Sequence, residues 1–166
     1  MFFVARVLLS QRTTGSPPAG RYVFKPGDNR HVGEGIDVLG MAGAVHLIDD
    51  DPDFRRGLER LLRAHGMEVK AFESAEEFLA QESPEEAGCL ILDIHLGGIS
   101  GIELRRRLAK NPAFDIPVVF VTAIESQAIR DAAVEAGCVA VLQKPFPGKA
   151  LMDVVARALA PEPMGY

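Results

Sequence analysis

A chain of 166 residues, 48% hydrophobic and 25% charged, has the size and composition of one globular domain with its own core. Its formal net charge of −5 is uneven, because residues 1–43 carry five Lys/Arg against three Asp/Glu and the remainder carries 13 against 20. The acidic main part argues against direct nucleic-acid binding, since it repels a phosphate backbone. No apolar stretch approaches the length that crosses a bilayer, so we expect no membrane association.

Two features of composition refine this picture. The basic run Arg105-Arg106-Arg107 is interpreted as a solvated helix face rather than a nucleic-acid patch. Cys89 and Cys138 each begin an apolar run without metal-type spacing, which indicates two reduced cysteines packed as small hydrophobic residues. We therefore expect a cytoplasmic location.

The two ends of the chain are predicted to lie outside the main domain, which spans residues 44–160. Residues 1–43 hold seven of the 16 glycines without sustained periodicity, which predicts a disordered or non-core extension. A short strand at 21–24, a partner-binding role for this arm and a true start at Met41 are alternatives. The tail at 161–166 is too short for a DNA-binding helix-turn-helix, so we expect output through protein contacts unless the chain is a fragment.

From Ala44 onward, short apolar runs alternate with amphipathic stretches. The run 44–48 predicts a buried strand, and Asp51 before Pro52 predicts the N-cap of a helix that ends at Gly66. The apolar positions of this helix include Phe54 and His65. A second strand is predicted at 68–72.

Each later pair repeats this pattern. Capping boxes predict two helix starts, Ser74 with Glu77 and Ser100 with Glu103, and Ser126 caps a further helix. Three further strands and a last helix are predicted at 89–92, 117–121, 139–142 and 151–159. Five strand-helix pairs with apolar strands predict an α/β fold, a doubly wound, flavodoxin-like, five-stranded parallel sheet with five helices.

Polar side chains follow four of the five predicted strands, namely Asp49-Asp50, Asp93, Thr122 and Lys144. In the strand order 2-1-3-4-5, the first and third strands are neighbours, so Asp50 and Asp93 are expected to face each other at the carboxyl edge of the sheet. Packed carboxylates repel unless they are neutralised, and a hard dication such as Mg²⁺ suits them. Lys144 adds a second cation and Thr122 a hydroxyl donor.

The histidines and Asp51 have simpler interpretations. Asp51 is explained as a helix cap, His46 as a strand filler and His65 as a cation at a helix end. No histidine metal cluster or catalytic triad can be assembled from the sequence. His95 lies two residues beyond Asp93, at the mouth of the expected site.

These residues resemble the response regulator receiver family, the CheY-like superfamily, over about residues 44–160. The motifs that carry the resemblance are Leu47-Ile48-Asp49-Asp50-Asp51-Pro52, Leu92-Asp93 followed by Ile99-Ser100-Gly101-Ile102-Glu103-Leu104, Val121-Thr122-Ala123, and Lys144-Pro145-Phe146. Their order and separations match as well, which makes the combined pattern specific although each piece alone is weak.

The resemblance implies a role for each strand-end residue. Asp93 would be the phosphorylated nucleophile, and a sensor histidine kinase or phosphotransfer protein would be the donor. Asp50, Asp93 and the His95 backbone carbonyl would bind Mg²⁺, with Asp49 acting mainly through a metal-bound water. Thr122 and Lys144 would bind the phosphoryl oxygens, and the bond before Pro145 would be cis.

Two departures from the family pattern bear on signalling. Leu96-Gly97-Gly98 stands where the family has Met-Pro, which predicts a more mobile loop. Val141 stands where the family has a switch aromatic, three residues before Lys144, which predicts a weaker or differently routed response.

Three functions compete. The leading hypothesis is a stand-alone phosphoacceptor module of a two-component system that is not an enzyme, beyond phosphorylating itself from small donors and dephosphorylating itself. It would act on an unknown downstream protein or pass phosphate along a relay. A haloacid-dehalogenase-like phosphohydrolase would need an aspartate where His95 stands. A phosphorylation-independent scaffold would not need Asp50, Asp93, Thr122 and Lys144.

Overall fold

The computed structural model describes residues 43–81 and 86–159 of the chain. The predictions of a non-core extension, of a strand at 21–24, of a start at Met41 and of a tail at 161–166 fall outside the described residues, apart from Gly43.

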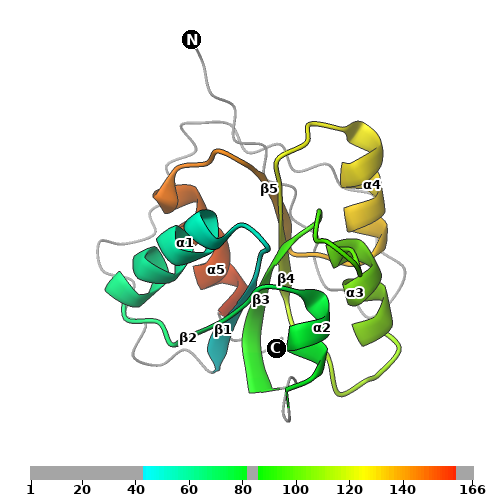
Figure 1. Cartoon of the computed structure of the whole chain (residues 1–166), viewed down its shortest axis with the longest axis horizontal. Helices are drawn as coiled ribbons and strands as arrows, with labels where there is room; N and C mark the ends of the chain where they lie inside the picture. The colour runs from blue at the N-terminus through cyan, green and yellow to red at the C-terminus, as the bar shows by residue number, and fades with distance from the viewer. Residues whose placement is uncertain (1–42, 82–85, 160–166) are drawn as a thin grey trace, which may run out of the picture.

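A five-stranded parallel sheet forms the centre of the domain (Figure 1). Its strands are β1 (Ala44–Ile48), β2 (Val69–Phe72), β3 (Ala87–Asp93), β4 (Val118–Thr122) and β5 (Ala140–Gln143). Their order is β2-β1-β3-β4-β5. The predicted flavodoxin-like order is therefore confirmed, and it makes β1 and β3 direct neighbours.

Helices cover both faces of this sheet (Figure 1). They are α1 (Pro52–Ala64), α2 (Ala75–Leu79), α3 (Gly101–Leu108), α4 (Gln127–Glu135) and α5 (Gly148–Leu159). One core joins α1 and α5 to the sheet through buried residues such as Leu62 and Leu151. A second core lies on the opposite face, where α2, α3 and α4 contribute residues such as Phe78, Leu104 and Ala133. Burial on both faces explains why the central strands are apolar throughout.

The predicted helix caps are all present. Asp51 accepts hydrogen bonds from the backbone N–H groups of the first turn of α1, and Ser74, Ser100 and Ser126 each accept one at α2, α3 and α4. The expected glutamate half of each capping box differs. The Glu77 carboxylate accepts from the N–H of Glu73, and the Glu103 carboxylate pairs with Arg107 one turn later. In the pair of Glu103 with Arg107 both groups are charged, whereas in the expected bond from a backbone N–H only the acceptor would be.

Two smaller expectations need correction. His65 is exposed at the C-terminal end of α1 instead of on its apolar face, and its Nδ1 lies 2.8 Å from the Leu61 carbonyl oxygen. Arg105 is half-buried and donates to the Gly137 carbonyl, so the basic run is not a uniformly solvated face.

Cys89 and Cys138 are buried thiols that are not joined in a disulfide, in line with the prediction of reduced, packed cysteines. Burial raises the pKa of each thiol to about 12, so both stay protonated and chemically inert at neutral pH. Within the described ranges, no helix is long and apolar enough to cross a membrane.

Candidate functional site

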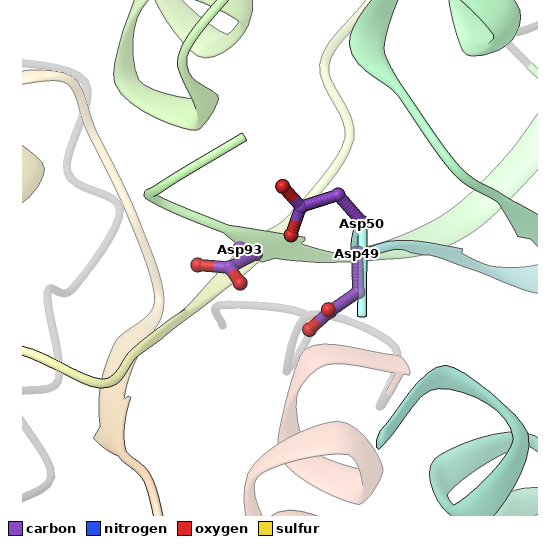
Figure 2. Close-up of side chains that lie close together, drawn as sticks. All are labelled: Asp49, Asp50 and Asp93. Carbon is purple, nitrogen blue, oxygen red and sulfur yellow. The ribbon is translucent and has the colours of Figure 1, made fainter. Parts of the chain in front are cut away.

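The carboxylates of Asp49, Asp50 and Asp93 converge at the carboxyl edge of the sheet (Figure 2). Asp49 and Asp50 directly follow β1, and Asp93 is the last residue of β3. One carboxylate oxygen from each residue lies within 4.8 Å of the others. Because β1 and β3 are adjacent parallel strands, residues 43 or more positions apart in the chain reach the same point.

Lys144 reaches this cluster from the residue after β5. Its Nζ donates to Asp49 Oδ2 at 2.7 Å and to Asp93 Oδ2 at 2.9 Å. The peptide bond from Lys144 to Pro145 is cis, as the resemblance implied. One ammonium therefore bridges two of the three carboxylates.

Thr122 ends β4 beside the cluster and is buried. Its hydroxyl accepts from the N–H of Ile124 at 3.1 Å and lies 3.4 Å from His95 Nδ1. His95 is exposed, and its backbone N–H donates to Asp93 Oδ1 at 2.9 Å. Each oxygen of Asp93 thus accepts one hydrogen bond, Oδ1 from the His95 backbone and Oδ2 from Lys144.

Burial differs sharply among the three carboxylates. Asp49 is 1% exposed and Asp93 is 6% exposed, whereas Asp50 is an exposed residue. Burial raises the pKa of Asp49, although the hydrogen bond from Lys144 opposes this effect. Burial would lower the pKa of Lys144, but its bonds to Asp49 and Asp93 outweigh it and raise that pKa. The site therefore holds a charged lysine against carboxylates that gain from further positive charge.

This donor set fits Mg²⁺. The cluster has three carboxylates and one ammonium, which contacts only Asp49 and Asp93, so negative charge is left to be neutralised. All three offer hard oxygen ligands, and the exposure of Asp50 leaves the cluster open to solvent, as an ion that retains waters requires.

Sequence reasoning assigned Asp51 no chemistry, and its side chain caps α1 at the N–H groups of Asp53 and Phe54. Two residues that contact the site or its loop were missed. Phe54 lies beside Lys144, and Glu76 of α2 accepts a hydrogen bond from the β3–α3 connection. Phe54 was predicted only as part of the apolar face of its helix, and nothing near Glu76 in the sequence signals its partner.

The family model of the response regulator receiver domain matches residues 45–156, which is more than half of the chain. This chain belongs to the response regulator receiver domain family. The match lies within the predicted main domain, and membership confirms the resemblance and the assignment to two-component signal transduction.

Curated relatives of this chain support the same family assignment. Nodulation protein W of Bradyrhizobium diazoefficiens is 38% identical over 114 residues, covering 69% of this chain and 50% of that protein. The transcriptional regulatory protein TdiR of Thauera aromatica is 34% identical over 121 residues, covering 73% of this chain and 53% of that protein. The chain thus spans about half the length of these curated relatives.

A solved structure also resembles the receiver. The crystal structure of a putative response regulator from Chloroflexus aurantiacus superimposes with a TM-score of 0.68 at 33% identity, covering 72% of this chain and 99% of that one. Membership in a signalling phosphoacceptor family argues against the phosphohydrolase hypothesis, which also lacked its second aspartate at His95.

Proposed function

We propose that the receiver accepts a phosphoryl group on Asp93 from a histidine kinase or a phosphotransfer protein, in a reaction that depends on Mg²⁺. The observation that carries the proposal is the bridging contact of Lys144 with Asp49 and Asp93, beside the exposed Asp50. An acidic cluster with one fixed ammonium has the charge pattern that phosphoryl transfer needs, because positioning and charge neutralisation supply most of its catalysis.

In this proposal the acidic residues divide the work of holding Mg²⁺. Asp50, Asp93 and the backbone carbonyl of His95 bind the ion, and Asp49 acts through a metal-bound water. When bound, the ion neutralises charge on the carboxylates and on the incoming phosphoryl oxygens. The exposure of Asp50 supports its role, since it leaves one side of the cluster accessible.

The transfer itself forms one bond and breaks one. A carboxylate oxygen of Asp93 attacks phosphorus, and the bond from phosphorus to the donor nitrogen breaks, leaving its electron pair on the imidazole of the donor. The product is a mixed anhydride between Asp93 and phosphate. Lys144 gives up its contact with Asp93 Oδ2 and donates to a phosphoryl oxygen instead, while the Thr122 hydroxyl donates to another.

Output is proposed to go through contacts with a downstream protein rather than with DNA. The net charge of −7 over residues 44–166 supports this assignment, since a phosphate backbone would be repelled.

Intact-mass measurement after incubation with acetyl phosphate and Mg²⁺ tests the proposal. We expect one phosphate adduct in the wild type and in Asp131→Asn, a matched change of an exposed aspartate on α4. We expect none in Asp93→Asn, with its melting temperature showing an intact fold. An adduct that persists in Asp93→Asn, or that forms equally well in excess chelator, would contradict the proposal.

A further inference from the structure

The β3–α3 loop (residues 94–100) carries the pair Gly97-Gly98. Three of its backbone N–H groups donate to carboxylates that belong to three different segments. His95 donates to Asp93 at 2.9 Å, Gly97 to Asp50 at 3.3 Å, and Ile99 to Glu76 at 3.0 Å. Two of these carboxylates are the metal ligands of the proposed function, and the third lies outside the site.

Glu76 is an exposed residue in the first turn of α2, and its Oε1 accepts the bond from Ile99. That backbone hydrogen bond is the main cause that lowers the pKa of the Glu76 carboxyl, so the group is ionised when it holds the loop. A bond to an ionised acceptor is stronger than a neutral one. Glu76 thus anchors the far end of a loop whose near end is bonded to Asp93.

The backbone conformation and the space at position 98 suit glycine better than any residue with a side chain. Its φ is +86°, and an added Cβ would lie 2.7 Å from Glu76 Oε1. An L side chain at 98 would therefore be strained in its backbone and would push against the carboxylate that holds Ile99. At Gly97, no atom lies within 4 Å of an added Cβ. The space for a side chain therefore differs between the two adjacent glycines.

The hydrogen bonds donated by Gly97 and Ile99 are coupled, because these residues are two positions apart on one short loop. Release of Ile99 from Glu76 would free the segment that presents the Gly97 N–H to Asp50 Oδ2. Asp50 is exposed and lacks the packing that holds Asp49 and Asp93 in place, so its orientation depends more on such a bond.

We infer that Glu76 is a positioning residue for the metal site: it holds the β3–α3 loop so that Gly97 orients Asp50 and the His95 carbonyl stays in place. The inference rests on the proposed function, in which Asp50 and the His95 carbonyl bind Mg²⁺. Glu76 itself touches neither the ion nor the phosphoryl group.

Amide hydrogen exchange of the metal-free protein and calorimetric titration with Mg²⁺ together test this role. In Glu76→Ala we expect faster exchange at Ile99 and Gly97. Residues that orient metal ligands typically change affinity by about 10- to 100-fold, and for this exposed bond we expect a loss of about three- to tenfold. Glu76→Gln keeps an acceptor oxygen and should restore most of the affinity. Glu77→Ala removes the same charge from the next position and should leave both readouts near wild type.

The glycines provide a second, independent pair of variants. Gly98→Ala should weaken Mg²⁺ binding as Glu76→Ala does, whereas Gly57→Ala on the exposed surface of α1 should not, because an added Cβ there meets no atom within 4 Å. The double change of Glu76 and Gly98 should be no worse than the more severe single change, since both break one contact.

The inference is overturned if Glu76→Ala leaves exchange at Ile99 and Mg²⁺ affinity unchanged, or if Glu77→Ala lowers the affinity as much. Failure of the proposed function has a different signature. A wild-type protein that binds no Mg²⁺ contradicts both that function and the inference, whereas one that binds Mg²⁺ but gains no phosphate on Asp93 contradicts the function alone. If the wild type binds Mg²⁺ and gains phosphate on Asp93 normally, and Glu76→Ala has the same Mg²⁺ affinity and amide exchange, only the inference is contradicted.

Discussion

The Nζ of Lys144 lies 3.9 Å from the centroid of the Phe54 ring. Phe54 belongs to the first turn of α1, and its ring in turn meets Phe146 edge to face, with centroids 5.8 Å apart. The ammonium that bridges Asp49 and Asp93 is therefore held on its other side by an aromatic face, which attracts a cation and restricts the lysine.

Phe54→Leu should slow phosphorylation of Asp93 from acetyl phosphate at saturating Mg²⁺. Loss of a cation–π contact worth about 0.5–2 kcal/mol corresponds to about a two- to thirtyfold slower reaction if Lys144 loses its position. Phe54→Tyr keeps the aromatic face and should react at close to the wild-type rate. If Phe54→Leu and the wild type have equal phosphorylation rates and equal melting temperatures, the ring does not position Lys144.

Asp49→Asn should raise the melting temperature of the metal-free protein by a few degrees at neutral pH. Burial raises the pKa of Asp49, so the folded state binds its proton more readily than the unfolded state, and the ionised carboxylate costs stability above that pKa. Asparagine removes this cost in stability, but it also gives up the ionic hydrogen bond from Lys144 to the Asp49 carboxylate.

Thermal melts of both proteins with and without Mg²⁺ measure this effect. We expect Mg²⁺ to raise the melting temperature of the wild type more than that of Asp49→Asn. The difference between the two melting temperatures should therefore become smaller. A lower melting temperature for the metal-free variant would mean that the bond from Lys144 outweighs the burial of the charge.

His46 should make the protein sensitive to acid. It is fully buried on β1 against the rings of Phe72 and Phe78, and its Nε2 has no hydrogen-bond partner in the described structure. Burial, and then the charge of Lys70, lower its pKa from 6.5 to about 4. Since the unfolded state takes up the proton first, stability is fully present above pH 6.5 and is lost as the pH falls toward 4.

Denaturant unfolding of the wild type and of His46→Leu between these two pH values measures this contribution. One such proton adds a slope of about 1.4 kcal/mol per pH unit, and we expect the wild type to lose stability more steeply than the leucine variant. Parallel curves would show that His46 does not titrate between the two states in this window.

Val141 should limit the response of the surface formed by α4, β5 and α5 to phosphorylation. The side chain is 2% exposed within the core on the α2, α3 and α4 face, so it has no ring to move between buried and exposed positions when Thr122 engages the phosphoryl group. Amide chemical shifts with and without a phosphoryl mimic should change mainly around Asp93 and Thr122. Large changes confined to the surface of α4, β5 and α5 would contradict this prediction.

The sequence alone determined the fold and which polar residues stand at the carboxyl ends of its strands. Apolar runs of strand length, caps such as Asp51 and Ser74, and polar residues at four strand ends are local signals, and each follows from the chemistry of neighbouring residues. The parallel sheet then requires that the carboxyl ends of β1 and β3 meet, so the proximity of Asp50 to Asp93 could be predicted without coordinates.

Tertiary structure alone decided which residues support that site. Phe54 reaches Lys144, and Glu76 reaches Ile99, across 90 and 23 positions of the chain, and neither pair leaves a pattern in the sequence. Such contacts depend on how a helix is placed on its sheet and on the path of one loop. Local propensity does not encode these features, because they arise from the packing of the whole core.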